Sequence, residues 1–98
     1  MKIDISGLNK FFENRIRLGL MSILIVNDSY DFNSLKAALG VTDGNLASHL
    51  RALEENGLIR VSKKFIGKKP NTSYSATETG ERLFRAHLKA LEQIIRKQ

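Results

Sequence analysis

The sequence contains no cysteine, no long apolar run and no repeated or low-complexity segment. The absence of cysteine excludes disulfides, thiolate metal sites, cysteine nucleophiles and thiol redox sensing. Every apolar stretch is shorter than the roughly 20 residues of a membrane-spanning helix, and the first residues lack the basic and apolar regions of a secretion signal. We therefore expect a cytoplasmic protein that does not associate with membranes.

Groups that carry catalysis are also scarce. The two histidines, His49 and His87, fall in different predicted helices and lack the spacing of metal ligands. The chain has no glycine-rich phosphate loop and no pair of acids positioned for proton transfer. We expect no catalytic residues, no bound metal and no cofactor, and we interpret His87 as a packing or interface residue.

The chain has 98 residues, of which 42% are hydrophobic, and this is enough for one domain with a modest core. Residues 1–98 are therefore predicted to form a single domain. The formal net charge of +6 favours a polyanionic partner, although many basic domains bind none. The positions of the basic residues along the chain are therefore needed to distinguish a polyanion-binding domain from one that binds no polyanion.

A stretch from Val41 to Gly57 is the most informative part of the sequence. Its leucines at 46, 50 and 53 recur with the period of a helix and form one narrow apolar stripe. Thr42 is a good N-cap and Gly57 a good terminator, which predicts a helix over 43–56. The remaining faces carry small or hydrogen-bonding residues: Gly44, Asn45, Ser48, Arg51 and Ala52, with His49 on the flank. This composition suits contact with a polar partner, and the simpler alternative is a surface helix packed by three leucines.

Two further helices are predicted before this stretch. Apolar residues at helical spacing indicate a helix from residue 9 or 10 to 26, hydrophobic on most sides, and a loop over 27–31. Asn33 is predicted to cap a short helix, Ser34 to Leu39, which Gly40 ends. Because the helix over 43–56 starts within three residues of Gly40, the pair indicates a helix-turn-helix.

A basic hairpin is predicted after Gly57, where the apolar period changes from 3.6 to 2. We expect a strand over 58–66, a loop over 67–72 and a return strand over 73–76, and we interpret Phe65 and Tyr74 as core residues. Residues 60–69 contain five basic residues and no acid: Arg60, Lys63, Lys64, Lys68 and Lys69. The hairpin is therefore a candidate anion-binding surface, and the alternative is a hairpin whose lysines only prevent edge-to-edge pairing.

The last predicted helix covers 78–97 and is capped by Thr77. At about 30 Å it is long for so small a domain, so we expect part of it to project from the core and to be covered in a homodimer. The alternative is a helix folded back on the first one. The predicted interface consists of apolar residues from the first and last helices: Phe12, Ile16, Phe84, Leu88, Leu91 and Ile95.

The order of these elements resembles that of the winged helix-turn-helix transcriptional regulators of bacteria and archaea, in the broad MarR/ArsR group. The resemblance covers nearly the whole chain and is carried by LKAALG at 35–40, NLASHLRALEENGLI at 45–59, the hairpin, and TETG at 77–80. It implies an α+β, mostly α fold, a winged helix-turn-helix with a two-stranded basic wing over 60–74 and a long C-terminal helix. It names no operator and no small-molecule effector.

The resemblance also implies a mode of DNA binding. The helix over 43–56 would enter the major groove, with Asn45, Ser48 and His49 near base edges, and Thr42, Arg51 and the backbone at Gly44 near phosphate or sugar. The wing would place four lysines on phosphates or in a minor groove: Lys63, Lys64, Lys68 and Lys69. A twofold dimer would separate its recognition helices by about 34 Å, one turn of double-stranded DNA, and would bind a palindromic operator.

Two other functions fit the same pattern. Winged helices also serve as protein-protein interaction modules that bind no DNA, although a basic wing without acids favours this less. Structured RNA is a further possible partner, but the hairpin lacks the aromatic stacking residues of single-strand readers.

Overall fold

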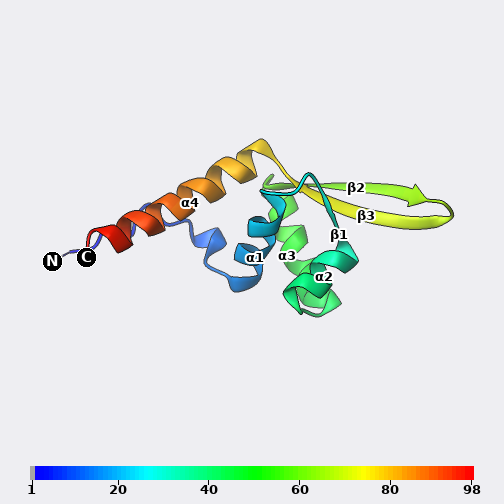
Figure 1. Cartoon of the computed structure of the whole chain (residues 1–98), viewed down its shortest axis with the longest axis horizontal. Coiled ribbons are helices and arrows are strands. Elements are labelled where there is room, and N and C mark those ends of the chain that lie inside the picture. The colour runs from blue at the N-terminus through cyan, green and yellow to red at the C-terminus, as the bar shows by residue number, and fades with distance from the viewer. Residues whose placement is uncertain (1) are drawn as a thin grey trace.

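The computed structural model describes residues 2–98, which form an elongated molecule of about 60 × 26 × 21 Å. In Figure 1, α4 and both chain termini occupy one end and the β2–β3 hairpin reaches to the other. The elements follow in the order Lys10–Phe12 (a 3-10 turn), α1 Arg15–Leu24, β1 Tyr30–Asp31, α2 Phe32–Leu39, α3 Asp43–Glu55, β2 Ile59–Ile66, β3 Lys69–Ala76 and α4 Glu78–Arg96. The mostly helical α+β class with a two-stranded hairpin is confirmed.

The single first helix expected from residue 9 or 10 to 26 is wrong, because the chain breaks at Glu13 and Asn14. The Asn14 side chain accepts hydrogen bonds from the N–H groups of Ile16 and Arg17 at 2.9 and 3.1 Å, and so starts α1 as its N-cap. The apolar period continues through the break, which conceals it in the sequence. Because the helix is interrupted here, the preceding turn can take a different direction and places the Phe12 ring against Phe84. The two ring centroids are 5.1 Å apart and the rings are nearly perpendicular.

The loop expected over 27–31 ends in a short strand. Tyr30 and Asp31 form β1 and pair with Tyr74 and Ser73, which makes the sheet three-stranded with the order β1-β3-β2. Asp31, and not Asn33 as predicted, caps α2 by accepting from the Ser34 N–H at 3.2 Å. The helix consequently begins two residues earlier than expected, at Phe32.

The core lies where α1, α2 and α3 meet the inner part of the sheet. Leu46, Leu50 and Leu53 are all buried, so the predicted apolar stripe of α3 is confirmed. Thr42 caps this helix as expected, and Gly57 follows its end with a φ of 71°. The α3 helix is therefore fixed by its apolar side and by both ends, and its other faces remain available.

The hairpin is longer and more regular than predicted. Strands β2 and β3 pair from Ile59 with Ala76 out to Ile66 with Lys69, so that only Gly67 and Lys68 form the turn. Gly67 has a φ of 64° while Lys68 does not have a positive φ, the pattern of a type II′ turn. Most of the loop expected over 67–72 is therefore strand.

One residue connects the hairpin to α4. The Thr77 N–H donates to the Leu58 carbonyl at 3.1 Å, and its hydroxyl donates to the Gly57 carbonyl at 2.7 Å. The same hydroxyl accepts from the Gly80 N–H at 3.0 Å and caps α4. A Cβ on Gly80 would lie 1.9 Å from the carbonyl oxygen of Leu58, the residue before β2, so α4 passes this backbone as closely as glycine permits.

Candidate nucleic-acid interface

Most of the α3 residues predicted to contact DNA lie on its exposed faces. Thr42, Gly44, Asn45, Ser48 and Arg51 are all exposed, while the leucines behind them anchor the helix. The Thr42 hydroxyl accepts from the Asn45 N–H at 3.2 Å, which orders the first turn and leaves the Asn45 amide side chain exposed. The structure therefore presents hydrogen-bonding groups along a rigid helix, a suitable arrangement for reading base edges.

Gly44 is the second residue of α3, and the space beside it is empty. A Cβ built on Gly44 would have no heavy atom within 4 Å, so packing within the chain does not require glycine there. Glycine also costs helix stability relative to alanine. A close external approach to the backbone at the helix N-terminus would account for its presence.

His49 is held by a side chain from another helix. The Arg17 Nε–H donates to His49 Nδ1 at 3.1 Å, and the Arg17 guanidinium stacks over the Phe11 ring at 4.2 Å from its centroid. Burial lowers the pKa of His49, and the charge of Arg17 lowers this pKa further. Because Nδ1 accepts a hydrogen bond in the neutral ring, Nε2 carries the hydrogen and is a donor.

Arg17 is a residue of the site that reasoning from the sequence missed. It lies on α1, 32 residues before His49, and no local pattern links the two positions. The Arg17 guanidinium also donates to the carbonyl oxygen of Phe11, which belongs to the turn before Asn14. The apolar period of the sequence conceals the break at Asn14. Only the packing of α1 against α3 brings Arg17 into contact with His49.

An ion pair connects the two helices of the helix-turn-helix. Lys36 of α2 lies 2.7 Å from the carboxylate of Asp43, the first residue of α3. Both side chains are substantially exposed, so the pair contributes at most about 1 kcal/mol to stability. The pair neutralises the carboxylate nearest to the polar face of α3. It therefore reduces the repulsion that a polyanion would meet on approaching this face.

The lysines of the wing lie on its surface. Lys63, Lys64, Lys68 and Lys69 are all exposed, as a surface for binding phosphate requires. The interpretation of Tyr74 as a core residue is confirmed, whereas that of Phe65 is wrong, since 75% of its surface is exposed. The hairpin extends past the helices beneath it, so the alternation of its residues continues where there is no core to cover them.

The residues predicted for a dimer interface fall into two groups. Phe12 and Phe84 are only 1% and 0% exposed, so they belong to the core of this chain and are removed from the predicted surface. His87 packs beside them, and its Nδ1 accepts from the Asn9 N–H at 2.9 Å, which makes it a packing residue. Leu88, Leu91 and Ile95 continue the stripe of Phe84 along α4, are exposed, and stay a predicted contact together with the half-buried Ile16.

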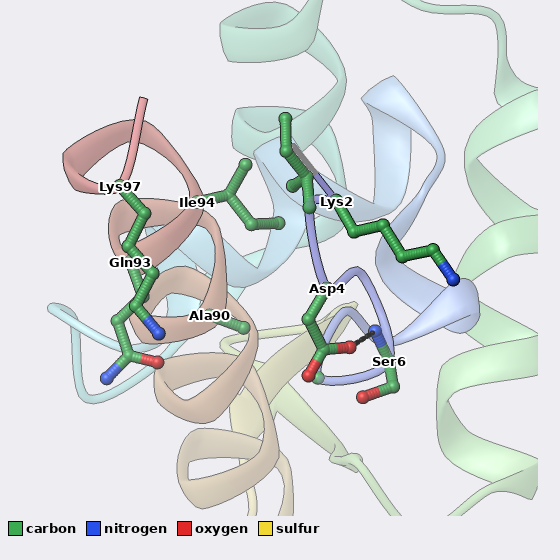
Figure 2. Close-up of a pocket in the computed structure, with 9 residues that line it drawn as sticks. Lys2, Asp4, Ser6, Ala90, Gln93, Ile94 and Lys97 are labelled. Carbon is green, nitrogen blue, oxygen red and sulfur yellow. Dashed lines mark hydrogen bonds between the residues drawn. The ribbon is translucent and has the colours of Figure 1, made fainter.

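A hollow of about 260 Å³ lies between the N-terminal segment and the last turns of α4 (Figure 2). Gly7 packs closely on α4 here, since a Cβ on it would be 3.1 Å from that of Ala90. Hydrogen bonds from the Ser6 side chain and N–H lower the pKa of Asp4, the acid drawn in Figure 2. Asp4 therefore has a local partner, and the hollow belongs to the end of α4 and not to α3.

Between residues 2 and 98, histidine and acidic side chains do not gather in groups of three or more that could hold a metal ion. None of the described helices has the length and apolar character needed to cross a membrane. The surface of α3 and the wing remains the strongest candidate site.

Comparisons with known proteins identify the family of the chain. A family model for a winged helix DNA-binding domain matches residues 16–95. The chain is 32% identical over 85 residues to an uncharacterized protein of Methanocaldococcus jannaschii, and the match covers 87% of this chain and 92% of the relative.

Solved structures of transcriptional regulators are also similar. One is a transcriptional regulator homologue from Pyrococcus horikoshii OT3, with a TM-score of 0.82 and 33% identity over 89% of this chain and 86% of that one. Another is a MarR-family regulator, described as putative, from Enterococcus faecalis V583, with a TM-score of 0.73, 28% identity, and coverage of 89% and 81%. The resemblance to the winged regulators is confirmed.

Proposed function

Because this chain belongs to the family of winged helix DNA-binding domains, we propose that it is a transcriptional regulator that binds double-stranded DNA as a homodimer. The observation that supports this most strongly is the joint presentation of the polar face of α3 and the lysines of the wing, both exposed. The role requires no cofactor, metal or catalytic step. We place it in the cytoplasm, where bacterial and archaeal regulators meet their DNA.

The proposal assigns sequence reading to α3. Asn45 and Ser48 lie near the N-terminus of the helix, where a recognition helix in the major groove contacts base edges. His49 offers a donor at Nε2 because Arg17 occupies Nδ1. A donor at this position suits an acceptor on a purine, such as N7, or a phosphate oxygen. Thr42, Arg51 and the backbone at Gly44 would contact phosphates and fix the orientation of the helix.

The wing is proposed to supply affinity that depends little on sequence. Replacing both Lys68 and Lys69 with alanine should weaken binding to every duplex and lower the slope of log K against log salt by about 2, near 0.9 for each lost phosphate contact. Fluorescence anisotropy over a series of salt concentrations measures both effects. The matched variant is Asn45→Ala, which should reduce discrimination between sequences and leave the salt slope unchanged. If both variants changed slope and discrimination equally, this division of roles would be wrong.

Gly44→Ala should change stability and DNA binding in opposite directions. Because a Cβ at this position meets nothing within 4 Å, alanine should stabilise the fold by about 0.5–1 kcal/mol through helix propensity. The added methyl group would occupy space needed by a phosphate close to the backbone, so affinity should fall about tenfold. Thermal unfolding and anisotropy on the same sample measure the two effects. A variant that is more stable and binds equally well would exclude a close backbone contact at Gly44.

The dimer is proposed to form through α4. This helix has 19 residues, and its distal half projects beyond the core with Leu88, Leu91 and Ile95 exposed (Figure 1). A stripe of this kind at an exposed helix is best covered by a second copy of the same stripe around a twofold axis. The two α3 helices would then reach successive major grooves about 34 Å apart, which requires a palindromic operator.

The proposed function is tested with two duplexes, one of random sequence and one taken from just upstream of the protein's own gene. Anisotropy titrations are made at low and near-physiological salt, and light scattering reports the mass of the bound species. Tight, salt-tolerant binding of a dimer to the upstream duplex supports a sequence-specific regulator. If neither duplex were bound at low salt, the DNA-binding role would be wrong and a protein partner would become the leading explanation.

A further inference from the structure

We propose that the tip of the wing is an apolar wedge that enters the minor groove of bound DNA and bends the duplex. The wedge consists of Phe65, Ile66 and Pro70. This inference rests on the proposed DNA-binding function and adds a deformation of the DNA to it.

The wedge is defined by its exposure. The side chains of Phe65 and Ile66 are 75% and 67% exposed, and Pro70 is exposed beside them. All three lie within the last two residue pairs before the turn, at the point of the molecule most distant from α4 (Figure 1). A large aromatic and a large aliphatic side chain in water at the end of a hairpin contribute nothing to the core of this chain.

The register of the hairpin makes the tip apolar on both faces. Phe65 pairs with Pro70, so these two side chains share one face, and Ile66 pairs with Lys69 on the other face. The face of Phe65 is the continuation of the one that buries Ile59 and half-buries Val61 closer to the core. The tip therefore has the form of a thin sheet with apolar groups on both sides.

The positive charges around the tip favour a polyanion as its partner. Lys63, Lys64, Lys68 and Lys69 flank the apolar residues, and no acid lies between residues 56 and 77. A protein or lipid surface that covered only Phe65 and Ile66 would leave these four cations unpaired. The minor groove instead combines apolar sugar walls with a row of phosphates on each side, which matches an apolar strip between lysines.

The dimensions explain why the DNA would bend. The axes of two paired strands are about 4.8 Å apart and their atoms extend beyond these axes, whereas the minor groove is only about 6 Å wide. Phe65 and Ile66 project from opposite faces and make the tip thicker than the groove. Entry therefore requires the groove to open, and apolar wedges that open the minor groove bend the duplex toward the major groove.

The test uses energy transfer between dyes at the two ends of a duplex of about 30 base pairs that carries flexible TA steps where the wings would reach. Binding of the natural protein should shorten the distance between the ends. The double variant Phe65→Ser, Ile66→Ser should bind about tenfold more weakly and, at saturation, should leave the duplex nearly straight. Its melting temperature should be unchanged, because both replaced side chains are largely exposed.

A matched variant separates the wedge from the charges. Lys68→Ala with Lys69→Ala should weaken binding but retain the bend once the duplex is saturated. Equal bending by the natural protein and by the double serine variant would overturn the wedge while leaving the DNA-binding function intact. Loss of self-association in the serine variant with unchanged bending would also overturn it, and would assign the tip to contacts between copies. A natural protein that bound no duplex would contradict the proposed function itself.

Discussion

Replacing Leu91 and Ile95 with glutamate should convert the protein to a monomer and weaken its binding to a palindromic operator by on the order of 100-fold or more. Both side chains lie on the projecting half of α4 and are 43% and 63% exposed, so they are available to a second copy of the chain. Two charges at a twofold contact would face their own copies, and like charges in an apolar interface are strongly unfavourable. The loss in affinity follows because a monomer engages one half-site and forgoes the effective concentration that a linked second site provides.

The single substitution Lys89→Asp is the matched control for the change in charge. It lowers the formal charge by two, the same amount as the double glutamate variant, on a side of α4 away from Leu91. The control should stay dimeric and should lose much less affinity. Analytical ultracentrifugation gives the association state and anisotropy gives the affinity. If the double glutamate variant remained a dimer, the two copies would have to meet through another surface.

The second large effect is expected from Gly80→Ala, which should destabilise the fold by at least about 2 kcal/mol. A Cβ at this position would lie 1.9 Å from the Leu58 carbonyl oxygen, a backbone atom that cannot rotate away. The helix would have to move away from Leu58, which would stretch the hydrogen bond from the Thr77 N–H to the same carbonyl. The gain in helix propensity, about 1 kcal/mol, is too small to compensate.

Thermal unfolding measures this effect, and a loss of about 10 °C in melting temperature is expected for a domain of this size. Gly44→Ala is the natural control, since it makes the same chemical change in another helix where a Cβ meets nothing. The two variants should therefore shift the melting temperature in opposite directions. A Gly80→Ala variant as stable as the natural protein would mean that α4 does not pass Leu58 as closely as the structure places it.

Elements whose ends are marked by local chemistry could be predicted from the sequence. The α3 and α4 helices were predicted within one residue because Thr42 and Thr77 are capping residues directly followed by a helical pattern. The exposed polar face of α3 followed from the positions of three leucines. Local signals were therefore enough for these two helices and for most of the proposed contacts with DNA.

Features that depend on distant partners could not be predicted in this way. Strand β1 has only two residues, and it forms because they pair with residues more than 40 positions later in the chain. The bond between Arg17 and His49 likewise exists only because α1 packs on α3. Phe65 was misinterpreted because alternation in a strand shows which residues share a face but not how far the core extends beneath it.

The two-residue turn at Gly67 and Lys68 makes the reach of the wing adjustable. Beyond Val61 the hairpin rests on little of the domain, so residues can be added at its end without disturbing the helices. Because successive side chains alternate between faces, each added residue pair would place its side chains on the faces opposite to those of the pair before it. Two added pairs would lengthen the wing by about 6.6 Å and would leave the faces of Phe65 and Ile66 unchanged. Insertions confined to the loop at the tip could thus let the wing reach a groove farther from α3 without a change in the helices.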